Sequence, residues 1–383
     1  MRRGSRPPRI VLAIALGATC GVLFLGWVFE HLPPVVRADA LITIDVGVTR
    51  WVTHPPIVTD TVTSSRVTEG VGEAAPHPYD DERTSSTFLF LGDIMLDRMV
   101  ALRMRKAKDV AYPFKKLPEH WIGSFNYTLA NLEGPVTPTR RPTTKSISFQ
   151  FAPSVVPVLK DEGIDAVSQA NNHTFDQGRT GFTDSQALLK KGGLLAFGSE
   201  LSDGEIALAT TTINGTRFAF LGFNSVTKPF NRVDAARVIK EAKAQADFVI
   251  AMPHWGIEYQ DMPTQSVVEM GHWFIDQGVD AIIGGHPHWA QGISVYKNKP
   301  IVWSLGNFVF DQDWSVRTNQ GLTIAMTVEG KSVTLEPIPI QIKESQPRVV
   351  EGAEKEKRLK QLASISDEAL REEILQNKIV FAR

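Results

Sequence analysis

Short apolar runs that stop abruptly at polar residues recur through the central part of this 383-residue chain, and they limit the folds open to it. Runs such as residues 88–91 and 279–283, which are bounded by glycine, are typical of strands buried inside a sheet. As far as Ile283 these runs alternate with segments of helical character, and after it hairpin signals replace the helices. This order predicts an α/β domain in which stacked sheets are covered by helices.

One of these runs, residues 279–283, ends in two glycines and then places His286 and His288 on a single loop. Pro287 lies between the two histidines and limits the backbone there. Two imidazoles this close can reach the same small volume, and neutral imidazole nitrogen binds zinc, manganese and iron. The pair alone is equally typical of surface histidines beside a tryptophan, so the metal hypothesis depends on other loops.

Four other strand ends carry a side chain of the kind that binds metals, namely Asp93, Glu133, Asn172 and His254. In layered α/β folds the loops at the carboxyl ends of strands gather in one cleft, so these side chains are predicted to meet His286. Each also has a purely structural interpretation. Asp93 and Asn172 suit turns, the carboxylate before Gly134-Pro135 can be solvated, and His254 can be a packed loop histidine.

Short motifs lie at or beside these loops, in order from Phe88 to Asp311. They are Gly92-Asp93-Ile94-Met95-Leu96, Asn131-Leu132-Glu133, Asn171-Asn172-His173, His254-Trp255-Gly256, Gly285-His286-Pro287-His288 and Ser304-Leu305-Gly306-Asn307-Phe308. In type, order and spacing they resemble the CapA family of capsule and poly-γ-glutamate synthesis proteins. CapA-like proteins are in turn similar to the calcineurin-like metallophosphoesterases, so the resemblance implies a four-layer sandwich of two mixed sheets flanked by helices.

The resemblance also implies a centre for one or two divalent metal ions. The implied ligands are Asp93, Glu133, Asn172, His254, His286 and His288. Glu133 matches the carboxylate that bridges two metals in the superfamily. The asparagine and the first two histidines would complete one site, while Asp93 and His288 would join Glu133 in the other. Manganese, iron or zinc suit this mixture of nitrogen and oxygen ligands better than calcium does.

Catalytic roles are implied for His173 and Asp176. His173 matches the histidine that faces the substrate and protonates the leaving group. Asp176, further along the same loop, would either orient His173 through a hydrogen bond or cap the local turn. Because two cations can polarise a phosphoryl oxygen and activate water, such a site suits phosphoester hydrolysis.

Two positions depart from the motifs. The superfamily places a histidine two residues after the first aspartate, but this chain has Met95 there, so the Asp93 site has one ligand fewer. The CapA-like motif usually carries a further histidine where Gly285 stands. We expect the second change to alter the rim of the centre and to leave His286 and His288 in place.

The resemblance implies a part in capsule or poly-γ-glutamate biosynthesis or export, with a metal-dependent phosphoesterase-like site acting on an anionic polymer or a phosphoester. Two other functions fit the same motifs. One is a non-enzymatic scaffold that binds the membrane subunits of a polymer synthase, which Met95 favours slightly. The other is a metal-dependent hydrolase or transferase that acts on the γ-glutamyl amide polymer.

The N-terminus predicts a single membrane anchor, because Arg2, Arg3, Arg6 and Arg9 precede an uncharged apolar stretch at residues 10–29. At about 1.5 Å per residue, a helix of this length crosses the roughly 30 Å hydrocarbon core of a bilayer. The arginines place residues 1–9 in the cytoplasm and the catalytic domain outside it, at the cell membrane. A cleaved signal peptide, processed at Ala38-Asp39-Ala40, is the alternative.

Composition predicts the remaining boundaries. Residues 30–86, rich in Thr, Val and Pro, are predicted to form an extracytoplasmic linker, residues 87–345 the CapA-like domain, and residues 346–383 a charged, exposed helical tail. The only cysteine, Cys20, lies in the predicted anchor, so the outer domain has no internal disulfide. A net charge of −1 without a long basic run argues against nucleic acid as a partner.

Overall fold

The computed structural model describes residues 85–199, 207–330 and 332–382. The predicted basic tail at 1–9, the anchor at 10–29 and the linker up to residue 84 lie outside these residues. In the part of the chain that is described, no helix combines the length and the apolar character needed to cross a bilayer.

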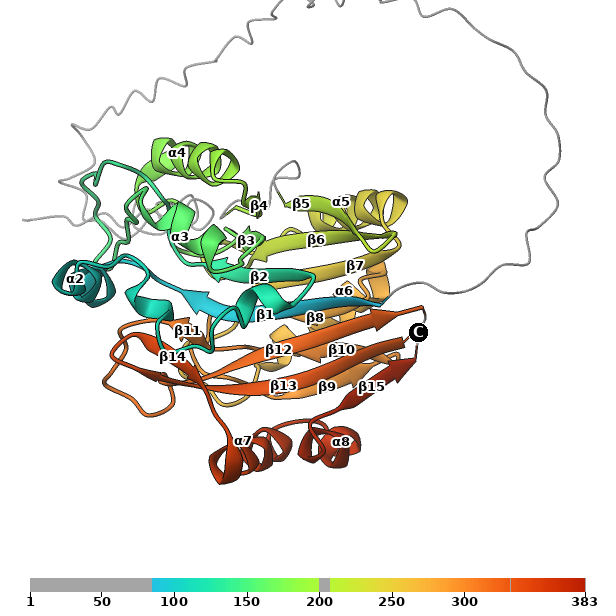
Figure 1. Ribbon diagram of the computed structural model, residues 1–383. Coiled ribbons are helices and arrows are strands. Elements are labelled where there is room, and N and C mark those ends of the chain that lie inside the picture. The colour runs from blue at the N-terminus through green and yellow to red at the C-terminus, as the bar shows by residue number, and fades with distance from the viewer. Residues whose placement is uncertain (1–84, 200–206, 331, 383) are drawn as a thin grey trace, which may run out of the picture. The chain divides into compact units, whose positions relative to one another are not determined.

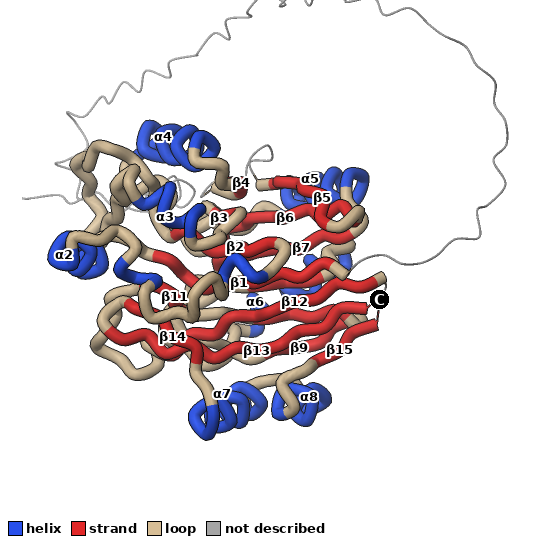
Figure 2. The backbone as a smooth tube through the Cα atoms, viewed as in Figure 1, coloured by secondary structure: helices blue, strands red, loops and turns tan. Residues whose placement is uncertain are grey.

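Two mixed sheets pack face to face (Figures 1 and 2). The larger sheet has the order β14-β13-β12-β1-β2-β3-β4, with β11 paired to β1 and β15 paired to β13. Its strands are β1 (Ser86–Ile94), β2 (Tyr127–Leu132), β3 (Ala166–Ser168), β4 (Leu195–Phe197), β11 (Asn307–Val309), β12 (Gln320–Glu329), β13 (Ser332–Lys343), β14 (Gln346–Val349) and β15 (Ile379–Ala382). The sheet is mixed because β1 runs parallel to β2 and antiparallel to β12.

The smaller sheet has the order β5-β6-β7-β8-β10-β9. Its strands are β5 (Leu208–Ile213), β6 (Thr216–Asn224), β7 (Phe248–His254), β8 (Ala281–Ile283), β9 (Ile293–Tyr296) and β10 (Lys299–Val302). Strands β5 and β6 form a tight hairpin around Asn214 and Gly215. These two residues have positive φ angles of 47° and 78°, which a two-residue turn between such strands requires.

Strand β1 is apolar throughout because both of its faces are buried. Phe88 and Phe90 point into the layer between the sheets, where the Phe88 ring lies 4.7 Å from the Phe218 ring of β6, centroid to centroid. Leu89 and Leu91 alternate with them and join the apolar layer on the opposite face. A strand covered on both sides needs a continuous apolar sequence rather than an alternating one.

Helices cover the outer faces of both sheets (Figure 1). Over the larger sheet lie α2 (Arg98–Ala107), α3 (Val155–Asp161) and α4 (Gly178–Lys191), and over the smaller sheet lie α5 (Arg232–Gln245) and α6 (Gln265–Gln277). Single 3-10 turns occur at η2 (Tyr112–Phe114), η3 (Ile122–Ser124) and η4 (Glu368–Leu370). The predicted α/β fold with two mixed sheets flanked by helices is therefore confirmed.

Side-chain caps and glycine determine where these helices begin and end. Asp97 caps α2 by accepting a hydrogen bond from the backbone N–H of Arg98 at 2.7 Å. Asn231 caps α5 in the same way, and α6 ends at Gly278, whose φ of 108° few other residues adopt. Because α2 starts at Arg98, the chain turns away from β1 only a few residues after Asp93.

The C-terminal segment differs from the charged, exposed helical tail predicted at 346–383. It adds β14 and β15 to the larger sheet, and between them lie α7 (Gly352–Ser364) and α8 (Arg371–Leu375). Leu362 and Ile374 of these helices join the layer between the sheets, and Asp367 accepts a hydrogen bond at 2.8 Å from the backbone of β9. Apolar residues three to four positions apart among the charged ones bury one face of α7, so the segment belongs to the same folded unit.

Candidate metal centre

The carboxyl ends of five strands, β1, β2, β3, β7 and β8, bring the predicted ligands to one end of the sandwich. In the larger sheet Asp93 of β1 lies beside Asn131 of β2, and Glu133 follows β2 directly. In the smaller sheet β7 ends at His254, which pairs with Gly285 beyond β8. The two sheets thus place their ligand-type side chains at neighbouring strand ends.

The loop that follows β8 is held in a strained conformation. His286 and His288 have positive φ angles of 97° and 57°, a region that side chains other than glycine seldom occupy. Gly284 lets this loop pass close to the chain after β10, because a Cβ at that position would lie 2.2 Å from the backbone oxygen of Trp303. Strain that the surrounding fold maintains is concentrated at functional sites.

Three side chains, Asp93, Glu133 and His288, form one buried cluster whose potential ligand atoms all lie within 4.8 Å of one another. His288 Nδ1 lies 3.4 Å from Asp93 Oδ2, and His288 Nε2 lies 3.7 Å from Glu133 Oε1. Among the described residues, Asp93 Oδ2 and both carboxylate oxygens of Glu133 have no hydrogen-bond partner. Buried carboxylates without partners are costly, and a cation removes that cost, so the cluster can hold a metal ion.

The pKa shifts of Glu133 and His288 also indicate that this cluster attracts a cation. Burial raises the pKa of Glu133 well above its usual range, the charge of His288 opposes the shift and that of Asp93 adds to it. Burial lowers the pKa of His288, but the carboxylates of Glu133 and Asp93 outweigh it and raise the pKa to about 9. The two carboxylates therefore attract positive charge into the space between them.

The other three predicted ligands, Asn172, His254 and His286, lie together beside this cluster. His254 Nε2 is 3.0 Å from Asn172 Oδ1, and the rings of His254 and His286 are 4.8 Å apart. Burial lowers the pKa of His254 well below its usual value, and burial with the nearby His288 lowers that of His286 to about 3. Both imidazoles are thus neutral, the form that binds metals, and His286 Nδ1 has no partner among the described residues.

Asparagine side chains connect the two groups, and sequence analysis did not single them out as site residues. Asn131 Nδ2 donates to Asp93 Oδ1 at 2.7 Å and lies 3.5 Å from His254 Nδ1. Asn171 in turn donates to Asn131 Oδ1 at 3.0 Å. On a strand, residues two apart share a face, so the spacing of Asn131 from Glu133 was the available signal.

His173 and Asp176 form a hydrogen-bonded pair at the same site. His173 Nδ1 lies 2.6 Å from Asp176 Oδ2, which leaves Nε2 facing the cluster, 3.9 Å from Glu133 Oε1. Asp176 also accepts from the backbone N–H of Phe149 at 2.7 Å, and the Phe149 ring lies 4.2 Å from that of His173, centroid to centroid. These contacts orient the imidazole through its partner, one of the two roles expected for Asp176.

Lys145 is a second residue that sequence analysis missed. Its Nζ donates to Asp176 Oδ1 at 2.8 Å and to the backbone oxygen of Asn172 at 2.7 Å. It therefore joins the partner of His173 to the loop that carries a predicted ligand. Lys145 belongs to an irregular segment far from the motifs, and neither periodicity nor spacing marks it.

Tyr259 extends the site on the side of the smaller sheet. Its ring stacks 6.0 Å from that of His288, and its hydroxyl accepts a hydrogen bond from Gln312 at 3.1 Å. Gln312 also accepts from Asn307, whose Oδ1 lies 2.9 Å from His288 Nδ1. Burial and the nearby charge of Glu258 raise the pKa of Tyr259. Asn307, which belongs to the motif at residues 304–308, thus fixes the orientation of the His288 ring through Nδ1.

The two departures from the family motifs have different consequences in the structure. Met95 is fully buried, and its sulfur accepts a hydrogen bond from the backbone N–H of Asp97 at 3.1 Å. Gly285 lies inside the centre, because a Cβ there would be 3.2 Å from Asp93 Oδ1 and 3.7 Å from His254 Nδ1. A histidine at this position would therefore meet the ligands themselves, whereas the sequence predicted a change at the rim.

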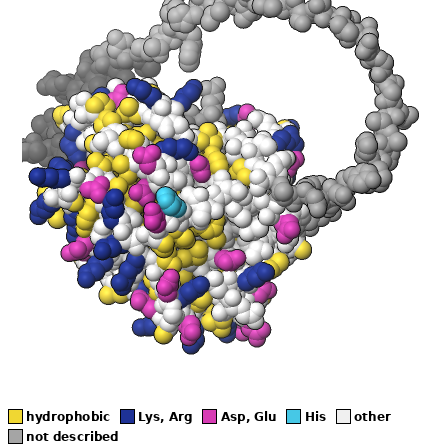
Figure 3. All heavy atoms as spheres, viewed as in Figure 1, with side chains coloured by type: hydrophobic (Ala, Val, Ile, Leu, Met, Phe, Trp, Pro, Cys, Tyr) yellow, Lys and Arg dark blue, Asp and Glu magenta, His cyan; other side chains and the backbone are white. Residues whose placement is uncertain are grey.

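The surface of the domain carries both charges. On the face shown in Figure 3, Lys and Arg side chains are interspersed with Asp and Glu side chains and with hydrophobic patches. Near the centre, the loops after β7 and β11 expose Ile257, Met262, Trp314 and Val316, which are between 55% and 72% exposed. On this face no single sign of charge dominates, so a charged ligand would be attracted by a few nearby side chains rather than by the face as a whole.

These features define the class to which the domain belongs: an α/β sandwich of two mixed sheets with a buried Asp93, Glu133 and His288 group that can hold a metal ion. Residues 87–312 match the family model described as bacterial capsule synthesis protein PGA_cap. The chain belongs to this family, as the resemblance to CapA proteins predicted.

Named relatives agree with this assignment. The chain is 32% identical over 290 residues to the PGA biosynthesis protein CapA of Bacillus subtilis (strain 168), covering 71% of this chain and 75% of the relative. It is 30% identical over 295 residues to the capsule biosynthesis protein CapA of Bacillus anthracis, covering 71% of each. It is 24% identical over 322 residues to a probable polyglutamine synthesis accessory protein of Mycobacterium tuberculosis, covering 67% and 84%.

Proposed function

We propose that this chain is a membrane-anchored, extracytoplasmic hydrolase of capsule or poly-γ-glutamate biosynthesis or export, with a metal-dependent phosphoesterase-like centre. One observation carries the proposal: three oxygens of Asp93 and Glu133 that lack hydrogen-bond partners among the described residues converge with His288 in a buried space. The family and the printed names of the relatives support the polymer pathway.

The residues present suit one or two divalent ions. Asp93, Glu133 and His288 would hold one ion, while Asn172, His254 and His286, with Glu133 between the groups, would hold the other. Manganese, iron or zinc match these nitrogen and oxygen donors. When bound, such ions would polarise a phosphoryl oxygen and activate water.

The chain's own side chains would handle the proton and the position of the substrate. Asp176 accepts from His173 Nδ1, so a proton at Nε2 would face the leaving group. Lys145 fixes the other oxygen of Asp176, which keeps the imidazole in one orientation. The buried walls of the site limit access of water to the reacting group.

The location in the cell is part of the proposal. The apolar stretch at residues 10–29 and the arginines before it support a single-pass anchor with the domain outside the cytoplasm. An anionic polymer or a phosphoester is the proposed substrate, and membrane subunits of a polymer synthase are the proposed partners. Fusion of a reporter after residue 383, with a second after residue 9, would test this topology.

Metal content and hydrolysis measured on one preparation would test the centre. The full-length chain, purified in detergent, should contain Mn, Fe or Zn by mass spectrometry and should cleave an aryl phosphate. His286→Ala should lose metal and activity together. His272→Ala is the matched control, because His272 lies on α6 and stacks on Tyr296 with ring centroids 3.9 Å apart, away from the centre. Equal metal content in His286→Ala and the unaltered chain would refute the proposed ligand set.

A non-enzymatic scaffold is the second candidate, and the position of Met95 favours it. The superfamily has a histidine there, whereas the sulfur of Met95 is already hydrogen-bonded to the backbone of Asp97. A scaffold would retain membrane partners in a pull-down and would turn over neither an aryl phosphate nor a γ-glutamyl amide. Turnover of the amide alone would instead identify the centre as an amide hydrolase or transferase.

A further inference from the structure

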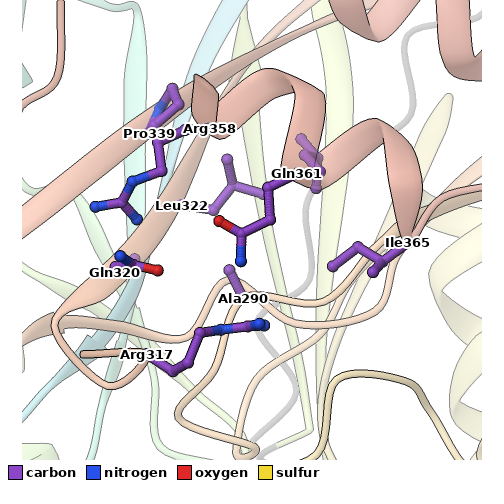
Figure 4. Close-up of a pocket in the computed structure, with 10 residues that line it drawn as sticks. Ala290, Arg317, Gln320, Leu322, Pro339, Arg358, Gln361 and Ile365 are labelled. Carbon is purple, nitrogen blue, oxygen red and sulfur yellow. The ribbon is translucent and has the colours of Figure 1, made fainter. Parts of the chain in front are cut away.

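A cavity of about 40 Å³ lies beneath α7, away from the metal centre. Its walls come from α7, from β12 and β13, and from the chain that follows the loop of His286 and His288. Figure 4 shows Arg317, from the loop before β12, and Arg358 and Gln361, both from α7, pointing toward this space. None of the described residues that line the cavity is acidic, so its polar lining is cationic or neutral.

Arg358 is the more buried of the two arginines, with 9% of its surface exposed. Its Nη2 donates to the neutral Gln341 Oε1 at 2.6 Å, and its nearest carboxylate, Glu354, is 3.4 Å away. Within the described part of the chain, Nε and Nη1 of Arg358 donate to no protein acceptor. Burial lowers the pKa of Arg358, Glu354 opposes the shift, and the like charge of Arg317 adds to it. The guanidinium is therefore incompletely compensated by protein.

Arg317 is held in place from outside the cavity. It pairs with Asp261, and its guanidinium carbon lies 4.9 Å from the centroid of the Trp289 ring. Trp289 follows His288 directly, and Ala290, the next residue, lines the cavity. The arginine is thus a fixed donor shared between this cavity and the segment that leads away from the metal centre.

The size of the cavity limits what it can accept. Since a single water needs about 10–15 Å³ by this measure, the space holds roughly three water-sized atoms. That suits the head of one oxyanion and excludes a ring or a sugar. Arg317 and Gln361 are half-buried, so one side of the cavity remains accessible from solvent.

We propose that this cavity is a binding site for a compact oxyanion, a carboxylate or a phosphate group, held between Arg317 and Arg358. Guanidinium groups match the paired oxygens of both anions, and the side-chain amides of Gln320 and Gln361 are further donors. The site shares no lining residue with the metal centre and does not depend on it. An anion there offsets the repulsion between the two arginines and ties α7 to the loop after His288.

Calorimetric titration of the full-length chain in detergent, with EDTA present, tests this site. Inorganic phosphate is the probe in one arm and L-glutamate in the other, with ionic strength held constant by sodium chloride. We expect saturable binding of at least one anion, and the tighter one identifies the preferred group. Arg317→Gln should weaken binding by about tenfold or more, the usual effect of losing a charge-assisted hydrogen bond.

Gln361→Glu provides a test of opposite sign. It places a carboxylate of the same shape beside the arginines, so anion binding should be lost while the melting temperature stays the same or rises. Arg237→Gln, which removes an exposed arginine of α5 that pairs with Glu241, should leave binding within about twofold of the unaltered chain. His173→Ala, which removes a donor that faces the metal centre, should also retain binding, and this separates the cavity from that centre.

Three results would overturn the inference. The first is that neither anion binds the unaltered chain. The second is that Arg317→Gln and Gln361→Glu bind as tightly as the unaltered chain. The third is that His173→Ala alone abolishes binding. The last result would place the anion at the metal centre.

Discussion

Two regions of this domain are equally buried and yet stabilised in opposite ways. The layer between the sheets, with Phe88, Phe218 and Phe220, contains apolar side chains packed against one another. The cluster of Asp93, Glu133 and His288 is also buried, but three of its carboxylate oxygens have no hydrogen-bond partner in the described part of the chain. The first region stabilises the fold by itself, whereas the second costs stability until a cation enters.

The difference shows that a buried side chain does not necessarily stabilise the fold, because the sign of its contribution depends on its polarity. Apolar burial contributes about 25 cal/mol per Å² of surface removed from water. Burying two carboxylates with a single imidazole, His288, beside them has the opposite sign. The fold tolerates this cost because strongly packed strands hold the loops in place. The positive φ angles of His286 and His288 also cost stability, and the sheets beneath the loop maintain them.

Replacement of His173 should separate catalysis from metal binding at the metal centre. His173→Ala should lower phosphoester hydrolysis by about 10²- to 10⁴-fold, because it removes a general acid. Metal content should not change, since His173 is not among the proposed ligands. Hydrolysis rates and bound metal measured on the same sample would check this. Loss of metal together with activity would make His173 a ligand and would merge the two roles.

A substitution in the apolar layer between the sheets should change the stability of the fold and not the chemistry of the site. Phe220 is fully buried and stacks on Tyr127 with ring centroids 5.5 Å apart. Phe220→Ala should reduce the free energy of unfolding by about 3–5 kcal/mol, and denaturant titration followed by tryptophan fluorescence measures it. Val233→Ala, at an 80% exposed site on α5, should change it by less than about 0.5 kcal/mol. A loss equally small for both variants would contradict the proposed core.

In the cluster of Asp93, Glu133 and His288, a substitution should increase the free energy of unfolding rather than reduce it. In the metal-free chain, Glu133→Gln should raise the free energy of unfolding by about 1–3 kcal/mol. Burial raises the pKa of Glu133, so folding at neutral pH must desolvate or neutralise its carboxylate, and a neutral amide of the same shape avoids that cost. The same variant should bind less metal. Glu119→Gln, with a side chain that is 90% exposed, is the matched control and should change neither quantity. A less stable metal-free Glu133→Gln would show that the carboxylate is compensated by protein.

Metal binding at the cluster of Asp93, Glu133 and His288 should depend on pH. The pKa of His288 is raised to about 9, so below that pH the metal-free imidazole carries a proton that must leave before it can bind a metal. Metal affinity should therefore rise by about tenfold per pH unit per proton released between pH 7 and 9, then level off. Competition with a chelator across this range measures the slope. An affinity independent of pH would show that His288 is not a ligand.

Sequence patterns predicted much of the fold, and the reasons are visible in particular elements. The apolar runs at residues 88–91 and 279–283, which became β1 and β8, reflect the local requirement that a strand buried on both faces be apolar. The charged C-terminal segment was misjudged as an exposed helix. Its apolar face, with Leu362, is recognisable only once the open edge of the sandwich is known.

The candidate site divides in the same way. Residue patterns were enough to predict that the chain is similar to CapA proteins and which loops carry Asp93, Glu133 and His288. The folded domain was needed to show that these three side chains form the tightest cluster, that Asn131 and Lys145 support the site, and that Gly285 lies among the ligands. The two kinds of information differ in how far apart along the chain the interacting residues lie. A run of residues reports its own burial, whereas distances between distant loops depend on how two sheets pair and pack.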